Sequence, residues 1–269
     1  MIVFFRKGSF KILVFIFLLL FIASSKNLVT FSINPLMGFY KDLVGNGKNK
    51  WEYNVLLGSS FDHHHFDIRP GDIKKIKDSK FLVFIGTLEL EREVMKMVKN
   101  KEKIVLTDYL EVYDGDPHVW VSVKNSKKIV QVIYNYLYSK MDKKELYQNY
   151  RNLYKKYDEI DKRFTILFSK KDLPIFSYHN EFGYISRDYG IKINSLFEHE
   201  EDISPKHLKE MIKKLRSYGN RKVYIILPPH YDEKVVNYIK NNSKNVEFIV
   251  FNSNSVNLYD EFVKLMSLK

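Results

Sequence analysis

Apolar and polar stretches alternate along the chain with the spacing of strands and helices. Short runs rich in apolar and β-branched residues predict strands, and the amphipathic stretches between them have helical spacing. The run FLVFIG (81–86) is apolar throughout, which is typical of a strand buried on both faces. The predicted strands are residues 27–33, 51–58, 81–86, 103–110, 173–179, 193–199, 222–229 and 246–252. Because strands alternate with helices, we expect parallel βαβ units.

One long helix interrupts this alternation. Apolar residues recur at intervals of four and three over 22 residues, which corresponds to about 33 Å of helix. The members of this stripe are Leu146, Tyr150, Leu153, Tyr157, Ile160, Phe164 and Leu167. The stripe fits a coiled coil or a helix packed lengthwise on a core, and the neighbouring βαβ units favour the second interpretation. The stretch contains no glycine or proline, so the helix should be stiff.

The predicted fold class is therefore α/β, with two (βα)4-type lobes that contain parallel sheets. The N-terminal lobe comprises residues 26–142 and the C-terminal lobe residues 170–269, and one long rigid helix, residues 143–169, joins them. Ligands of open α/β sheets bind at the carboxyl ends of the strands, so we expect the site in the cleft between the lobes.

The first 25 residues have the pattern of a signal peptide. Arg6, Lys7 and Lys11 precede an apolar run, Ile12–Ala23, which ends in the small residues 23–25. The run is short for a membrane span, which needs about 20 residues, but an uncleaved anchor is the alternative. In either case we expect a periplasmic or cell-surface protein.

Composition narrows the chemistry. The chain of 269 residues has no cysteine, which excludes disulfides, thiolate zinc sites and thiol catalysis. Its net charge of +12 is compatible with nucleic-acid binding, but the lysines are scattered along the chain and no motif that reads DNA or RNA is present. We therefore expect no nucleic-acid partner, and we expect a monomer.

Histidines follow several of the predicted strands. The run His63–His65 comes after strand 51–58, His118 lies in the loop after strand 103–110, and His179 ends strand 173–179. Three imidazoles from three such loops can converge on one ion, with zinc the best fit and copper, nickel and iron as alternatives. His230 also follows a strand and is an additional candidate. Spacing alone leaves open whether these histidines are ligands or surface residues.

The motifs around these histidines resemble those of the zinc- and manganese-binding substrate-binding proteins of ABC importers, a family also described as ZnuA-like, TroA-like or cluster A-I. The resemblance extends from about Val29 to Met266 and rests on elements that occur in the family's order. They are VTFSINPLMGFYKDLVGNG (29–47), DHHHFDIRPGDIKKI (62–76), DPHVW (116–120), HNEFGYISRDYGIK (179–192) and SPKHLKEMIKKLR (204–216).

The resemblance implies which histidines bind the metal. In the family element H-x-[FY]-[ED], the ligand comes two residues before the aromatic residue, so Phe66 and Asp67 indicate His64. His118 and His179 occupy the second and third ligand positions. His63 and His65 flank the ligand and are at most auxiliary, as is His230.

The resemblance also bears on the metal and the fourth ligand. Manganese-type members carry Glu where this chain has His179, and three neutral nitrogens favour Zn²⁺ over Mn²⁺. At the end of the last strand, where relatives often have Asp, this chain has Asn252, so the fourth ligand is either the Asn252 amide or a water. Pro228 replaces a Glu that is frequent in relatives, and the histidine-rich loop of zinc-type members is missing.

By this resemblance the protein is the extracytoplasmic solute-binding component of an ABC importer. It would capture Zn²⁺ as cargo, with Mn²⁺ the second choice, and deliver it to the membrane permease. One alternative is a zinc-dependent hydrolase with a three-histidine site, for which Glu181 is a candidate base. We expect no enzyme, because Glu181 would point to a different helix face from His179. Another alternative is a diverged relative that acts as an adhesin or metal buffer.

Overall fold

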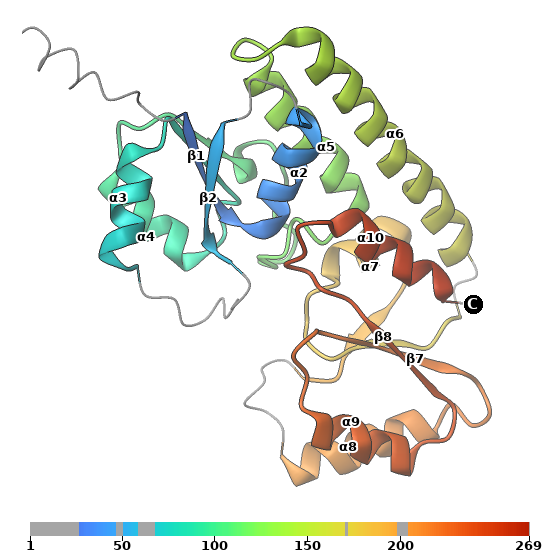
Figure 1. Ribbon diagram of the computed structural model, residues 1–269. Coiled ribbons are helices and arrows are strands. Elements are labelled where there is room, and N and C mark those ends of the chain that lie inside the picture. Colours follow the sequence, from blue (N-terminus) through green and yellow to red (C-terminus); the bar gives the residue numbers. More distant parts are fainter. Residues whose placement is uncertain (1–26, 47–50, 59–67, 170–171, 198–203, 269) are drawn as a thin grey trace, which may run out of the picture.

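The computed structural model describes residues 27–46, 51–58, 68–169, 172–197 and 204–268. Two α/β lobes lie one beside the other, and the long helix α6 runs along the side of both (Figure 1). This is the predicted fold class. The expected signal peptide, 1–25, and the run His63–His65 lie outside the described residues.

The N-terminal lobe is built on a parallel sheet with the strand order β2-β1-β3-β4. Its strands are β1 (Leu28–Ile33), β2 (Glu52–Leu57), β3 (Phe81–Phe84) and β4 (Lys103–Val105). The central strand β1 pairs Phe31 with Val55 on one side and with Val83 on the other. All four residues of β3 are buried, as its continuous apolar run predicts.

Helices cover both faces of this sheet. They are α2 (Asn34–Val44), α3 (Pro70–Asp78), α4 (Glu89–Met97) and α5 (Val123–Leu137). Helices α3 and α4 lie on one side of the sheet, and α2 and α5 on the side that faces α6 (Figure 1). Proline stands in the first turn of both α2 and α3, where a missing N–H costs no hydrogen bond.

The C-terminal lobe repeats the arrangement, with the strand order β6-β5-β7-β8. Its strands are β5 (Ile175–Ser177), β6 (Ile193–Ser195), β7 (Val223–Leu227) and β8 (Val246–Val250). Its helices are α7 (Gly183–Tyr189), α8 (Pro205–Arg216), α9 (Glu233–Asn242) and α10 (Leu258–Lys264). Helix α8 begins at the predicted cap, because the Ser204 side chain accepts a hydrogen bond from the His207 backbone N–H.

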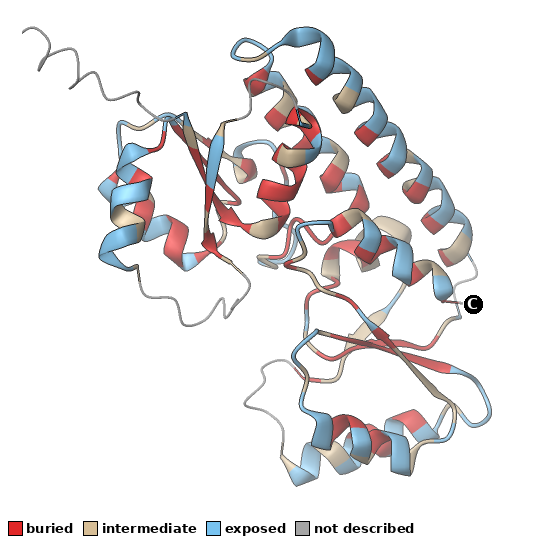
Figure 2. Cartoon of the chain, viewed as in Figure 1, coloured by how far each residue is buried: buried red, intermediate tan, exposed pale blue. Residues whose placement is uncertain are grey.

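Helix α6 (Lys143–Phe168) is 26 residues long and begins after Asp142, whose side chain accepts hydrogen bonds from two backbone N–H groups of the first turn. One buried stripe follows its length, as Figure 2 shows. Tyr157 and Phe164 within this stripe pack against Phe262 of α10, and Phe164 also contacts Tyr189 of α7. Tyr157 also packs against Phe39 of α2, so the stripe packs lengthwise on both lobes and is not a coiled-coil seam.

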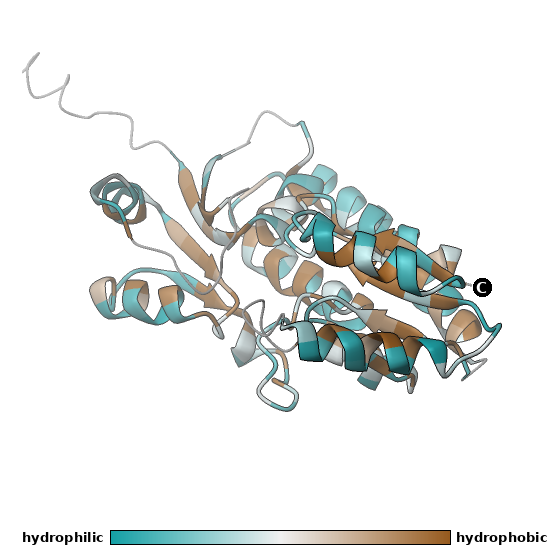
Figure 3. Cartoon of the chain, turned by 90° about the horizontal axis from the view of Figure 1, so that it is seen from below, coloured by the Kyte–Doolittle hydropathy of each residue, from teal (hydrophilic) through white to brown (hydrophobic). Residues whose placement is uncertain are grey.

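The two lobes share one hydrophobic core. A single cluster of buried side chains includes strands of the N-terminal lobe, the inner face of α6, and parts of β5, α7 and α10, while a smaller cluster lies under α8 and α9. Figure 3 shows the same pattern, with apolar strands between helices whose outer sides are polar. At Gly38 of α2 an added Cβ would lie 1.8 Å from the Val256 carbonyl oxygen. The backbones of the two lobes are therefore in direct contact there, and a residue with a side chain would not fit.

Three differences from the expected elements matter for the site. Strand β4 ends at Val105 and continues into a 3-10 turn, η1 (Leu106–Asp108), so the loop that carries His118 is longer than expected. Helix α5 is a separate element before α6. Helix α7 begins only at Gly183, which leaves Glu181 in the preceding loop.

A second 3-10 turn, η3 (Leu265–Ser267), follows α10. Within the described ranges, no helix is long and apolar enough to cross a membrane.

Candidate metal centre

His118 lies in the loop between η1 and α5, and only 4% of its surface is exposed. The Asp116 Oδ1 atom is 2.8 Å from the His118 backbone nitrogen and 2.8 Å from its ring Nδ1. An ionised carboxylate only accepts hydrogen bonds, so Nδ1 carries the proton and the lone pair is on Nε2. This carboxylate–histidine pair is the arrangement that orients a histidine ligand toward a metal.

The C-terminal lobe holds the Asp116 loop in place. The Tyr184 hydroxyl of α7 donates to the Asp116 carbonyl oxygen at 2.9 Å and accepts from the Tyr113 backbone N–H at 3.1 Å. An added Cβ at Gly183 would lie 2.5 Å from Asp116 Oδ2, so a side chain here would force the Asp116 carboxylate out of its present position. The second predicted ligand is therefore oriented by residues of both lobes.

His179 comes two residues after β5, at the carboxyl end of a central strand. Its ring and that of His118 are in edge-to-face contact, with centroids 5.5 Å apart and an interplanar angle of 82°. His118 also packs edge-on against Trp120, whose Nε1 donates to the Ser253 carbonyl oxygen at 2.8 Å. The structure thus brings two of the three predicted ligands together, one from each lobe.

The remaining predicted ligand, His64, lies outside the described residues together with His63 and His65. The described chain before this run ends at Gly58, whose carbonyl oxygen accepts a hydrogen bond from the Asn254 side chain at 2.8 Å. Among the described residues, no three His, Cys, Asp or Glu side chains are arranged to hold a metal ion. A complete three-ligand centre of these residue types therefore needs a residue from outside the described ranges.

The candidates for additional ligands differ in their surroundings. Asn252 follows β8, is partly buried, and accepts a hydrogen bond on Oδ1 from the Asn254 backbone N–H at 3.0 Å. Its own backbone N–H donates to Glu261 Oε2 at 2.9 Å. The amide oxygen thus takes part in a local turn, although an amide oxygen has a second lone pair for another partner. His230 is exposed in the loop between β7 and α9.

Glu181 is the functional candidate that the sequence pattern misplaced. The expectation that it sits on a helix is wrong, because α7 begins two residues later. Its side chain is 6% exposed. Burial raises the pKa of the Glu181 carboxyl, and the nearby His118 and a side-chain hydrogen bond with Ser253 offset part of that rise, while Asp116 adds to it. The signal in the sequence for a buried Glu181 was a single acidic residue just before the apolar and aromatic residues that follow His179.

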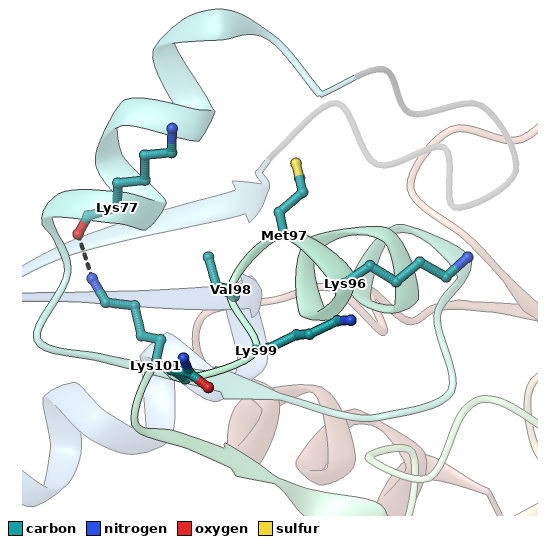
Figure 4. A pocket seen from close by; sticks show the side chains of 7 residues that line it. Lys77, Lys96, Met97, Val98, Lys99 and Lys101 are labelled. Atoms are coloured by element: carbon teal, nitrogen blue, oxygen red, sulfur yellow. Dashed lines mark hydrogen bonds between the residues drawn. The ribbon is translucent and has the colours of Figure 1, made fainter.

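A separate pocket lies at the other end of the N-terminal sheet. Figure 4 shows its lining of Lys77, Lys96, Met97, Val98, Lys99, Asn100 and Lys101, at the carboxyl ends of α3 and α4. The Lys101 Nζ donates to the backbone carbonyls of Ile76 and Lys77, which end α3. These lysines complement the carbonyl ends of helices and offer no metal ligand, so we assign the pocket a structural role.

Comparison with known proteins bears on the family and the fold. The family described as "ZnuA: Zinc-uptake complex component A periplasmic" matches residues 29–267. The metal ABC transporter substrate-binding lipoprotein FimA of Streptococcus parasanguinis is 27% identical over 222 residues, which are 72% of this chain and 70% of FimA. The manganese ABC transporter substrate-binding lipoprotein PsaA of Streptococcus pneumoniae is 25% identical, with the same coverage.

A zinc-binding relative is also similar. The zinc-binding protein AdcA of Streptococcus pyogenes is 25% identical over 241 residues, which are 76% of this chain but 46% of AdcA. Among solved structures, that of ZnuA has a TM-score of 0.75 at 16% identity and covers 89% of this chain and 96% of its own. The Zn(II)-bound ZnuA-like domain of Streptococcus pneumoniae AdcA also has a TM-score of 0.75, at 19% identity, with 90% and 98% coverage. These two structures share the fold with this chain.

Proposed function

This chain belongs to the ZnuA family of metal-binding substrate-binding proteins of ABC importers, and from that premise we propose that its cargo is Zn²⁺. The observation that carries the proposal is the contact between the rings of His118 and His179, with Asp116 fixing the proton on His118 Nδ1. Imidazole nitrogens suit zinc, whereas manganese prefers carboxylate and carbonyl oxygens.

The proposed zinc site has His64, His118 and His179 as its protein ligands. His64 is the ligand that Phe66 and Asp67 indicate, and Gly58, the last described residue before it, accepts a hydrogen bond from Asn254 in the loop after β8. The Asn252 amide or a water completes the four-coordinate arrangement that zinc prefers. His63, His65 and His230 are proposed to contribute little.

The contacts between the lobes support a small tilt during metal capture and release and argue against a wide closure. The Ser122 hydroxyl donates to Asp188 at 2.5 Å, the Lys124 Nζ donates to the Asp188 carbonyl oxygen at 2.8 Å, and the Asn34 backbone N–H donates to Asn254 at 3.2 Å. A wide hinge motion would break these bonds and open the shared core. Release would therefore depend on movement of the ligand loops at the permease.

The proposed setting follows from the same premise. The protein would work outside the cytoplasm, exported by residues 1–25, as a monomer that meets an ABC permease in the cytoplasmic membrane. Histidine must be neutral to bind zinc, and its pKa is about 6.5 in general, so zinc affinity should fall as the pH drops below that value. We propose neither catalysis nor an adhesive role, since FimA, PsaA and AdcA are named for transport or metal binding.

Calorimetric titration of the purified protein with Zn²⁺ tests the proposal. We expect one zinc per chain, and a loss of most of the affinity in the single variants His64→Ala, His118→Ala and His179→Ala. His230→Ala removes an exposed histidine and serves as the matched control that should bind like the wild type. If the three ligand variants bind as tightly as the wild type, the assignment is refuted. A tighter affinity for Mn²⁺ than for Zn²⁺ would refute the choice of cargo.

A further inference from the structure

Helix α7 of the C-terminal lobe carries three polar side chains that act on the His118 loop of the other lobe. Tyr184, Arg187 and Asp188 follow the helical spacing i, i+3 and i+4, which places them on one face of α7. The Tyr184 hydroxyl binds the backbone of the loop directly. The helix begins four residues after His179, so it connects the two predicted ligands that the structure describes.

The Asp188 side chain is 5% exposed and uses both of its oxygens. Its Oδ2 atom accepts a hydrogen bond from the Ser122 hydroxyl at 2.5 Å. Its Oδ1 atom accepts from the Arg187 Nε at 2.9 Å and from the Arg187 Nη2 at 2.6 Å. Hydrogen bonds to an ionised acceptor are short and strong, so Asp188 firmly joins the start of α5 in the N-terminal lobe to α7 in the C-terminal lobe.

Ser122 transmits this restraint to the backbone beside His118. The residue is buried and caps α5, because its hydroxyl oxygen accepts a hydrogen bond from the Asn125 backbone N–H at 3.0 Å. The Asn125 side chain, which is also buried, donates to the Val119 carbonyl oxygen at 2.8 Å. Asp188 therefore fixes the hydroxyl of a cap whose hydrogen bonds reach the residue next to His118.

Arg187 acts on the other end of the loop. Its guanidinium lies over the ring of Tyr184, 4.9 Å from the centroid, and over the ring of Tyr113, 5.5 Å from the centroid. A guanidinium is attracted to the face of an aromatic ring, and the hydrogen bonds with Asp188 hold it in this place. Tyr113 precedes His118 in the loop and the start of α5 follows it, so α7 holds the loop at both ends.

We propose that Arg187 and Asp188 are positioning residues of the metal site, which hold the His118 loop of one lobe against the helix that follows His179 of the other. They act through the loop and are not ligands. A loop that is already held in its binding position loses less freedom when the ion binds, and such preorganisation mainly slows release. This inference rests on the proposed function, because it requires that His118 and His179 bind the same ion.

The first test uses the purified protein with Asp188→Asn, by calorimetric titration with Zn²⁺ and by stopped-flow release of zinc into a chelator. The Asn side chain keeps one acceptor atom, whereas Ser122 and Arg187 donate to different oxygens of Asp188, so one partner is lost. We expect one zinc per chain and a dissociation constant about 2- to 30-fold higher, the range for residues that act on a site without touching its ligand. Most of the change should be in the release rate.

Ser122→Ala and Ser204→Ala form a matched pair, which also serves if Asp188→Asn does not fold. Each removes a serine that caps a helix, α5 or α8, so each should lower the melting temperature of the metal-free protein. Of the two serines, Ser122 is the one bonded to Asp188, so Ser122→Ala should speed zinc release and Ser204→Ala should not. Equal release rates in both variants would overturn the positioning role.

A double-mutant cycle gives a readout that a merely structural role would not move. Asp188→Asn and Ser122→Ala break the same hydrogen bond, so the double variant should release zinc about as fast as the faster of the two single variants. If the two effects on the release rate multiply, Asp188 and Ser122 act independently, and the proposed route from α7 to the His118 loop is refuted.

The outcomes distinguish this inference from the proposed function. If the wild type binds Zn²⁺, and Asp188→Asn and Ser122→Ala release it at the wild-type rate, the positioning role is refuted and the proposed function stands. If the wild type binds neither Zn²⁺ nor Mn²⁺, both are refuted. If His118→Ala weakens binding and Asp188→Asn speeds release while Ser204→Ala does neither, both are supported.

Discussion

The rings of His118 and His179 touch edge to face with their centroids 5.5 Å apart, although the two residues belong to different lobes. His118 lies in the loop between η1 and α5 of the N-terminal lobe and His179 follows β5 of the C-terminal lobe, so their contact forms only where the lobes meet. The hydrogen bonds between the lobes and the shared core hold this contact in place. Metal affinity and the stability of the interface between the lobes should therefore change together in many variants.

Asp116→Asn should weaken zinc binding by about 10- to 100-fold, because an amide cannot fix the proton on His118 Nδ1 as a carboxylate does. Calorimetry with Zn²⁺ measures the change. Asp114→Asn is the control in the same loop, since Asp114 is exposed and its φ of 51° suits Asn as well as Asp. Equal losses in both variants would mean that the loop as a whole, and not the Asp116 carboxylate, decides affinity.

Gly183→Ala should destabilise the protein by about 1–3 kcal/mol, the usual cost of inserting a methyl group into packed surroundings. The new Cβ would stand 2.5 Å from Asp116 Oδ2, so the Asp116 carboxylate that binds the His118 ring has to move, and zinc affinity should fall as well. Chemical denaturation and zinc titration check the two effects. At Gly71 of α3 an added Cβ meets nothing within 4 Å, so Gly71→Ala should leave zinc affinity unchanged and should not lower stability, because Ala favours the helix over Gly. An unchanged zinc affinity in Gly183→Ala would contradict the proposed role of the Asp116 contact.

Within the histidine run, only His64→Ala should remove most of the zinc affinity. The register comes from Phe66 and Asp67, and neighbouring side chains of an extended segment point in opposite directions. His63→Ala and His65→Ala are the matched controls, each one residue away, and titration of the three variants compares them directly. Equal losses in all three would refute the register.

Tyr40→Phe should alter the stability of the protein at alkaline pH. Burial raises the pKa of Tyr40 to about 12, with a hydrogen bond to the Trp51 backbone as a smaller, opposing influence. The folded-state pKa lies above the ordinary value of 10, so the stability from this group is complete below pH 10 and is lost as the pH rises to 12. At about 1.4 kcal/mol per pKa unit, the loss approaches 2.7 kcal/mol.

Urea denaturation at pH 9, 11 and 12 tests this. At pH 9 Tyr40→Phe should be less stable by about 0.5–1.5 kcal/mol, because it lacks the hydrogen bonds with Trp51. As the pH rises to 12 the gap should close and then reverse, because only the wild type loses stability by ionisation of Tyr40. Tyr53→Phe is the control, since Tyr53 is 38% exposed on the adjacent strand β2. A gap between Tyr40→Phe and wild type that stays constant from pH 9 to pH 12 would contradict the raised pKa.

Most of the architecture is readable from the sequence because its signals are local. The apolar run of β3 predicts a strand buried on both faces, and the stripe from Leu146 to Leu167 predicts a long helix packed lengthwise. Proline in the first turn and Ser204 as a cap place the start of α8 correctly. The start of α7 was predicted too early, since the residues after His179 fit the helical pattern but form a loop. This error placed Glu181 on a helix, whereas it lies in the loop before α7.

The sequence by itself determined the alternation of strands and helices, the long helix, and which histidines are candidate metal ligands, because periodicity and motifs depend on neighbours along the chain. Only the tertiary structure decided that His118 and His179 meet across the lobes, that Gly183 admits the Asp116 carboxylate, and that Glu181 is buried beside His118. These relationships join residues from different loops, and their distances depend on how the two sheets and α6 pack. Burial and charge compensation are properties of that packing, so no local pattern in the chain encodes them.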